Sequence, residues 1–232
     1  MLGGMELPEA LHRVPLSFGQ CYLWRDGDEV TLIDSGPAGS GRTIAAALER
    51  LGLGRESVVR VVLTHYHADH AGSAAEIRGW AGAEVVAHVA EAPVIRGELA
   101  EPRPDLLPAE QQLMAAIGGA ELPAVPPCPV DREVADGDVL PFGGGARVVH
   151  GPGHTPGSIA LHVPGSRALF TGDTVAENQG TVLLGPFNLD RRQAAASFRM
   201  LTALDVDIAL VGHGEPVAGA DLRVAELGPF AG

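Results

Sequence analysis

Residues 64–70 have the sequence Thr64-His65-Tyr66-His67-Ala68-Asp69-His70 and directly follow residues 58–63, a run that is apolar except at Arg60. Such a run is typical of a strand that is buried on both faces. In an extended segment residues i and i+2 point the same way, so we expect His65 and His67 to converge on one point. The chain then turns, and Asp69 and His70 can address a second point. Three of the nine histidines fall within the six residues 65–70, which favours a metal-binding loop over a chance cluster.

Three single residues farther along the chain occupy the same kind of position. His154, Asp173 and His213 each follow an apolar run that is typical of a strand, and each is preceded by a glycine. Glycine lets the backbone approach its neighbours closely. One such loop would mean little, but three of them together with residues 65–70 supply five histidines and two aspartates. We therefore interpret all seven residues as metal ligands.

The number of ligands indicates how many metal ions are held. A tetrahedral zinc ion takes four ligands, so seven nitrogen and oxygen ligands are too many for one ion. They fit two divalent metal ions a few ångströms apart that share a bridging carboxylate. We assign the bridge to Asp173. Zinc is the default metal, while iron and manganese stay open because a His/carboxylate set suits all three.

The rest of the chain alternates short apolar runs with turn signals and helical patterns. Strands are predicted at residues 20–24, 30–33, 58–63, 84–87, 139–142, 147–150, 158–163, 168–171 and 207–211. Helices are predicted at about residues 44–51, 71–80 and 108–117, and from Asp190, which is suited to cap a helix N-terminus. Strands and helices are mixed in both halves, so we expect an α/β or layered α+β fold. The 232 residues suit a single domain.

Residues 93–129 differ in character from the rest, since they are rich in Pro, Ala and Glu. Apart from the predicted helix, this stretch has the composition of a connecting segment. Long irregular insertions in compact domains are often lids or substrate loops. A surface excursion without a role is the equal alternative.

Charge and composition limit the classes of partner. The formal net charge is -13 and no Lys/Arg cluster occurs, which argues against nucleic acid. No apolar stretch approaches the roughly 20 residues that span a bilayer, and the N-terminus has no signal-peptide pattern. We therefore expect a cytoplasmic protein that keeps Cys21 and Cys128 as free thiols. We expect a small-molecule substrate, no membrane partner, and a quaternary structure compatible with a homodimer.

These motifs together resemble the metallo-β-lactamase-fold superfamily. The resemblance extends from residues 20–24 and 32–36 through the His-x-His-x-Asp-His motif to His213. It implies a four-layer αββα sandwich of two mixed sheets flanked by helices. It also implies that His65, His67 and His154 hold the first metal, that Asp69, His70 and His213 hold the second, and that Asp173 bridges. Asp34 matches a position near the site, where it would orient a ligand histidine or the metal water; the alternative is a turn-forming aspartate after a strand.

The resemblance also bears on the reaction. We expect a hydroxide between the two metals to cleave a carboxylic ester, thioester or lactone, with Asp69 orienting the nucleophile or moving its proton and Tyr66 facing substrate. The bridging set looks more like glyoxalase II and lactonases than like β-lactamases. The segment after His213 is too short for the C-terminal helical domain of glyoxalase II.

Several alternatives stay open at this point. One is a mononuclear iron oxygenase similar to persulfide dioxygenases, which share several of these ligands. Others are β-lactamase or phosphodiesterase activity, and a non-catalytic metal-binding member of the superfamily.

Overall fold

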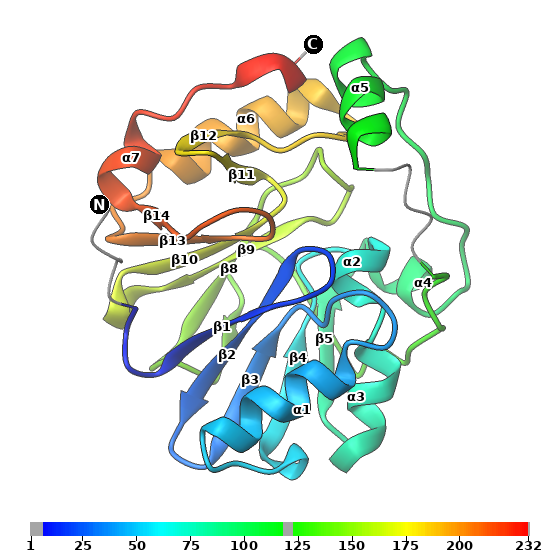
Figure 1. Cartoon of the computed structure of the whole chain (residues 1–232), viewed down its shortest axis with the longest axis vertical. Helices are drawn as coiled ribbons and strands as arrows, with labels where there is room; N and C mark the ends of the chain where they lie inside the picture. Colours follow the sequence, from blue (N-terminus) through cyan, green and yellow to red (C-terminus); the bar gives the residue numbers. More distant parts are fainter. Residues whose placement is uncertain (1–6, 118–122, 232) are drawn as a thin grey trace.

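The computed structural model describes residues 7–117 and 123–231 and contains two six-stranded mixed sheets packed face to face (Figure 1). Helices cover the outer surface of each sheet. The order of the layers is therefore helix, sheet, sheet, helix, which confirms the αββα architecture that the sequence resemblance implied.

The first sheet has the strand order β1-β2-β3-β4-β5-β6. Its strands are β1 (Leu11–Pro15), β2 (Gln20–Asp26), β3 (Glu29–Ile33), β4 (Val58–Val62), β5 (Glu84–His88) and β6 (Arg132–Val134). The first three strands pair antiparallel and β3 to β6 pair parallel. Helices α1 (Gly41–Arg50) and α3 (Ala74–Ala81) cover its outer face, where Ile44, Leu48 and Ile77 are fully buried. Ile44 and Leu48 are four residues apart in α1 and form the apolar stripe that the sequence predicted.

The second sheet has the order β14-β13-β10-β9-β8-β7. Its strands are β7 (Val139–Leu140), β8 (Ala146–His150), β9 (Ile159–Val163), β10 (Ala168–Gly172), β13 (Ile208–Val211) and β14 (Val217–Ala218). Strands β10 and β13 pair parallel, so their carboxyl ends lie at one edge. Helices α6 (Arg191–Thr202) and α7 (Gly219–Arg223) pack on the outer face. Asp190 caps α6 as predicted, because its carboxylate accepts a hydrogen bond from Gln193 N at 2.9 Å.

A separate apolar core lies between the two sheets. Tyr22 and Trp24 from the first sheet meet Phe170 from the second, with ring centroids 5.5 and 6.4 Å apart. The central strands are thus buried on both faces, which explains why β4, β10 and β13 have nearly continuous apolar sequences. Cys21 and Cys128 are buried, unpaired thiols, as expected.

The helix predicted over residues 71–80 is wrong in its bounds. The chain instead forms α2 (Ala68–Ala71) and then α3, with a break at residues 72–73. Gly72 packs closely on the loop between β3 and α1, and an added Cβ would lie 2.4 Å from Ala38 N in that loop. The Ser73 hydroxyl donates to Pro37 O at 2.6 Å in the same contact. Tertiary packing therefore ends the first helix one turn after it begins.

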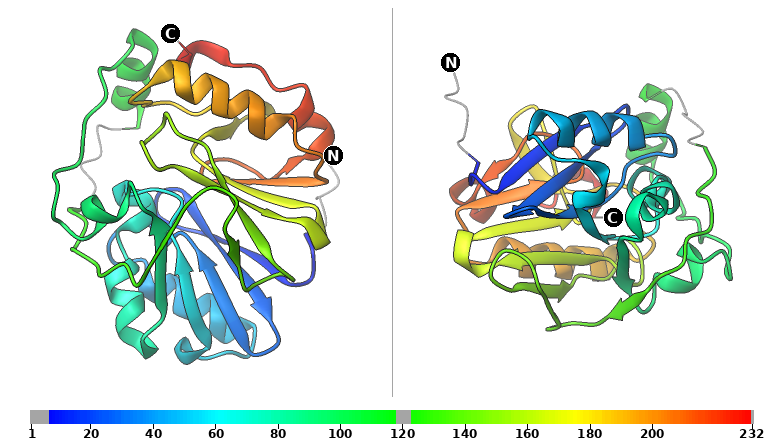
Figure 2. Two further views of the ribbon diagram at one scale, coloured as in Figure 1. Left: turned by 180° about the vertical axis from the view of Figure 1, so that it is seen from behind. Right: turned by 90° about the horizontal axis from the view of Figure 1, so that it is seen from below.

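Residues 93–129 contain the predicted helix as α5 (Pro108–Ala116), and α4 (Ala92–Ile95) overlaps their start. Residues 118–122 of this stretch lie outside the described residues. The segment between α4 and α5 runs along one side of the molecule, from the layers of the first sheet to the vicinity of α6 (Figure 2).

The sequence did not predict every element. The missed ones include β1, β6, β14, α4, α7 and the hairpin of β11 (Val175–Asn178) and β12 (Thr181–Leu184). Three short 3-10 helices are η1 (Arg55–Ser57), η2 (Pro164–Ser166) and η3 (Gly228–Phe230). Among the described residues, none of the helices has the length and apolar character needed to cross a membrane.

Candidate metal centre

Three histidines that follow the ends of β4 and β8 form a first cluster. His67 Nδ1 lies 3.0 Å from His65 Nε2 and 3.0 Å from His154 Nε2. The Nδ1 of His65 lies 3.0 Å from the Thr64 hydroxyl, which leaves His65 Nε2 directed at the other two rings. The backbone joins the two sheets at this point, because Ile159 N donates to Thr64 O at 3.0 Å. The side chains of His65 and His67 therefore converge, as the sequence predicted.

Four residues form a second cluster beside the first. His213 Nε2 lies 2.9 Å from Asp69 Oδ2 and 3.4 Å from Asp173 Oδ2. His70 Nε2 lies 3.1 Å from Asp173 Oδ1 and 3.6 Å from Asp69 Oδ2. Asp69 and His70 belong to α2, which turns them away from 65 and 67. The other two residues follow the neighbouring parallel strands β10 and β13.

Asp173, a member of the second cluster, also reaches the first cluster. Its Oδ2 is 3.8 Å from His154 Nε2 in the first cluster, while both of its oxygens face histidines of the second. The structure therefore brings together all seven residues that the sequence singled out as ligands.

The donor atoms fit metal ions. Two ligands about 2.1 Å from a tetrahedral zinc ion are roughly 3.4 Å apart, and the separations found here are similar. His70 Nε2 and Asp173 Oδ1 are buried 3.1 Å apart, and neither has a second hydrogen-bond partner among the described residues. A cation held between these two atoms would satisfy both of them.

The first cluster consists of neutral imidazoles, the form that binds metal. Burial lowers the pKa of His67 to about 3, with His154 adding to the effect. Burial and three neighbouring histidines hold the pKa of His65 well below its usual value. Protonation therefore does not compete with a metal at this cluster near neutral pH.

In the second cluster two carboxylates raise the pKa values of two histidines. Burial by itself would lower the pKa of His213, but Asp173 and Asp69 raise it to about 10. His70 is raised well above its ordinary pKa by Asp173, Asp69 and Asp34, again against burial. The pKa of Asp173 stays well below its usual value, because His70 and His213 outweigh its desolvation. The two carboxylates thus favour a positive charge at this cluster, and a divalent cation would supply it.

Asp34 orients His70. Its Oδ2 accepts a hydrogen bond from His70 Nδ1 at 2.8 Å, which fixes the tautomer whose Nε2 faces the cluster. Its Oδ1 accepts from Thr64 N at 2.8 Å. Asp34 has a φ of 60°, a left-handed conformation that is uncommon for residues other than glycine. These contacts match the orienting role expected from the sequence.

The ligands differ in exposure, and the three more exposed side chains mark the opening of the centre. The side chains of His65, His70 and His154 are about 1 % exposed, whereas those of His67, Asp69 and His213 are 16, 12 and 29 % exposed.

Two residues that the sequence analysis missed lie at this opening. Glu101 Oε1, from the 93–129 segment, is 3.7 Å from His67 Nε2. The ring of Phe18 meets His213 edge-on, with centroids 5.1 Å apart. Neither residue belongs to a motif, so no sequence signal marked them.

A family model described as the metallo-β-lactamase superfamily matches residues 14–213, which include every residue of both clusters. The chain belongs to the metallo-β-lactamase superfamily. Members with similar sequences include the probable metallo-hydrolase YflN of Bacillus subtilis, 28 % identical over 95 % of this chain and 89 % of that protein. A hydroxyacylglutathione hydrolase of Cereibacter sphaeroides is 30 % identical over 94 % of this chain and 71 % of the relative.

Solved structures of metallo-β-lactamase-superfamily proteins share the fold. A metallo-β-lactamase family protein of Thermus thermophilus superposes with a TM-score of 0.67 and 26 % identity, over 92 % of this chain and 75 % of that chain. The subclass B3 metallo-β-lactamase BJP-1 of Bradyrhizobium japonicum has a TM-score of 0.65 at 23 % identity, over 90 % of this chain and 76 % of its own. The latter likeness concerns the fold alone.

Tyr66 was expected to face the substrate, but its side chain is buried. It lies inside the superfamily's His-x-His segment, but its side chain is 2 % exposed and packs in the core under the first sheet. Its hydroxyl is buried and, among the described residues, has no hydrogen-bond partner. The alternation that turns 65 and 67 toward the metals turns Tyr66 the other way.

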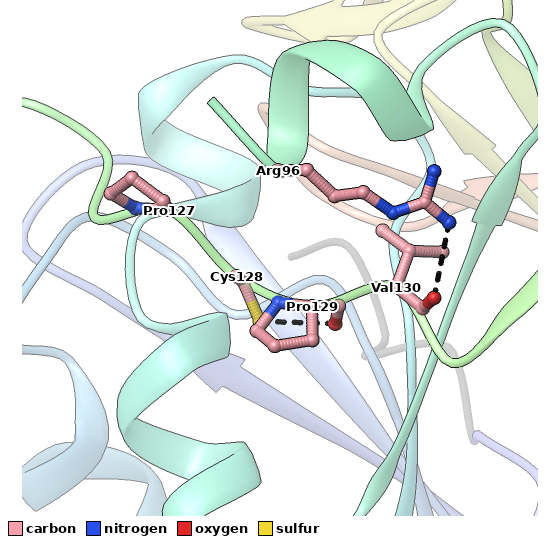
Figure 3. Close-up of a pocket in the computed structure, with 5 residues that line it drawn as sticks. All are labelled: Arg96, Pro127, Cys128, Pro129 and Val130. Atoms are coloured by element: carbon pink, nitrogen blue, oxygen red, sulfur yellow. Dashed lines mark hydrogen bonds between the residues drawn. The ribbon is translucent and has the colours of Figure 1, made fainter. Parts of the chain in front are cut away.

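A surface hollow elsewhere on the molecule does not contribute to the superfamily's metal centre. It is lined by Arg96 and residues 127–130, none of which is a ligand (Figure 3). Its one charged group is already engaged, since Arg96 donates to Val130 O at 3.2 Å and pairs with Glu133 at 2.6 Å. We therefore assign the chemistry to the seven-residue centre.

Proposed function

We propose that this chain is a two-metal hydrolase that cleaves a carboxylic ester, thioester or lactone of a small molecule. The observation that carries the proposal is the position of Asp173, which contacts both ligand clusters. The printed names of the relatives, a probable metallo-hydrolase and a hydroxyacylglutathione hydrolase, support the reaction class. Zinc is our preferred metal, because three neutral imidazoles suit it.

The chemistry divides between the metals and the chain. Bound divalent ions would lower the pKa of a water toward about 7 and polarise the scissile carbonyl. On the open side, the Asp69 carboxylate is suited to orient the attacking water and accept its proton. Its pKa is lowered by His70 and His213 despite its burial, so it is ionised at neutral pH. Asp34 keeps His70 turned toward the centre, and three of the ligand histidines are buried from water.

We also propose that residues 93–129 form one wall of the substrate site rather than a surface excursion without a role. The segment brings Glu101 to the opening, and the buried carboxylate of Glu110 on α5 anchors it. Glu110 accepts from Phe187 N at 2.7 Å and pairs with Arg191 at 2.9 Å. A carboxylate at the opening disfavours anionic substrates, so we expect neutral or cationic acyl groups to be preferred.

The test begins with metal removal. Dialysis of the purified protein against a strong chelator should abolish hydrolysis, and zinc or manganese should restore it. The substrate panel consists of lactones, aryl esters and thioesters, with β-lactams and phosphodiesters as contrasts. Full activity in the metal-free protein would overturn the proposal.

The same preparation separates the rival oxygenase. A mononuclear persulfide-dioxygenase-like enzyme would contain one iron per chain and consume oxygen when supplied with a thiol-derived persulfide. We expect two metal ions per chain and no such oxygen uptake. A metal-loaded protein that cleaves no member of the panel would favour a non-catalytic metal-binding member.

A further inference from the structure

Glu91 is a buried carboxylate that belongs to neither ligand cluster. It follows β5 and directly precedes α4, and its side chain is fully buried. Among residues 7–117 and 123–231 it forms no ion pair, so only hydrogen-bond donors compensate its charge. Burying an unpaired carboxylate is unfavourable, which makes its hydrogen-bond partners informative.

The two oxygens of Glu91 accept from two different ligand loops. Oε2 accepts from Tyr66 N at 2.9 Å, and Tyr66 stands between two ligands of the first cluster. Oε1 accepts from Gly157 N at 2.6 Å, three residues after the third ligand, His154. One carboxylate thus connects the loop after β4 with the loop after β8. Hydrogen bonds from backbone N–H groups to an ionised acceptor are among the stronger ones in proteins.

The Gly157 loop is built to approach this carboxylate. A Cβ added at Gly157 would lie 2.7 Å from His88 Nδ1 and 2.8 Å from both Cγ and Oε1 of Glu91. A side chain at 157 would therefore push the loop away from Glu91. Burial raises the pKa of Glu91 to about 7, while the Gly157 and Tyr66 amides and the Thr155 hydroxyl favour its ionised form.

We propose that Glu91 is a positioning residue for the first metal, holding the His65/His67 loop and the His154 loop at the separation that three-histidine ligation needs. The proposal rests on the two-metal function stated above. Metal–ligand distances tolerate deviations of only about 0.2 Å, so loosening either loop weakens binding. Among the described residues, Glu91 accepts no hydrogen bond from a residue of the second cluster, so the metal affinity of that cluster should not change.

The experiment is a zinc titration of the full chain against a chromophoric chelator. In Glu91→Gln the amide oxygen can accept from one backbone N–H, while its NH₂ group faces the other. We expect at least about a tenfold loss of affinity in one of the two binding steps, the size typical of residues that support metal ligands. Gly157→Ala should weaken the same step, because the added methyl group would push the loop away from an intact Glu91 and from His88.

The binding step is assigned with His154→Ala, which removes a ligand of the first site and leaves the second site to be measured alone. Glu91→Gln added to His154→Ala should change that remaining affinity by less than about twofold. The control is Asp131→Asn, since Asp131 also accepts a backbone N–H in the first sheet, from Val85 at 3.0 Å; its side chain otherwise pairs with Arg78 and contacts no ligand loop. It should leave both binding steps unchanged.

Two results would overturn the proposal. One is an unchanged first step in Glu91→Gln together with two zinc ions bound by the unaltered protein. The other is an equal loss at the residual site of the His154→Ala background, which would mean that Glu91 only supports the fold. An unaltered protein that binds no zinc would overturn the two-metal function itself as well.

Discussion

Replacing Gly212 by alanine should displace the bridging carboxylate without removing any ligand. A Cβ at residue 212 would lie 2.2 Å from Asp173 Oδ1 and 2.7 Å from His70 Cε1. Real Cβ contacts are essentially never under 3.0 Å, so the carboxylate oxygen must move by about 0.8 Å. That shift is about four times the 0.2 Å tolerance of a metal–ligand distance. We expect zinc content to fall from two toward one ion per chain, and kcat/KM to fall by about 100-fold.

The assay is elemental analysis of gel-filtered protein, followed by kinetics on the best substrate of the panel. Gly79→Ala is the matched control, because Gly79 lies in α3 and an added Cβ would meet nothing within 4 Å. It should keep both metals and stabilise the protein by about 0.5–1 kcal/mol. If Gly212→Ala retained two zinc ions and activity within a few-fold, Asp173 would not be bridging as we infer.

Three further predictions follow from the same geometry. Asp34→Ala removes the acceptor of His70 Nδ1 and should lower metal affinity or activity by about 10- to 100-fold, as measured by chelator competition and kcat/KM; unchanged values would assign Asp34 to the turn alone. In the metal-free protein the raised pKa of His213, about 10, stabilises the fold fully below its ordinary value near 6.5, and this contribution is lost as the pH rises to about 10. Urea unfolding of the metal-free protein should therefore show stability falling over that interval, with a much smaller fall in His213→Ala; an equal fall in both would assign it to other groups. Glu101→Gln should improve kcat/KM for an anionic substrate roughly two- to fivefold over a neutral analogue of the same shape, and an unchanged ratio would remove Glu101 from the opening.

The layered fold and the ligand set were largely predictable from sequence because they depend on local patterns. The apolar runs before His65, Asp173 and His213 are strands buried on both faces, and such strands have continuous apolar sequences. Alternation along the chain separated His65 and His67 from Asp69 and His70, and the resemblance to the superfamily assigned His154 and His213 to these two groups and made Asp173 the bridge.

The remaining features depend on contacts between distant segments. Glu91 and Glu101 are acidic residues in unremarkable surroundings, and only the folded chain brings them to Gly157 and to His67. The break at Gly72 is caused by its packing against Ala38, a contact that the helix propensities of the residues do not reveal. Tyr66 was assigned to the open side because it lies among ligands, although strand alternation already turned it inward.

The most direct test of the central claim is an anomalous difference map from a crystal of the zinc-loaded protein, recorded at the zinc absorption edge. We predict two peaks per chain. The first should lie about 2.0–2.1 Å from His65 Nε2, His67 Nδ1 and His154 Nε2. The second should lie about 2.0–2.2 Å from His70 Nε2, His213 Nε2 and an Asp69 oxygen, with Asp173 oxygens reaching both metals. A single peak, or peaks away from these atoms, would contradict the two-metal centre.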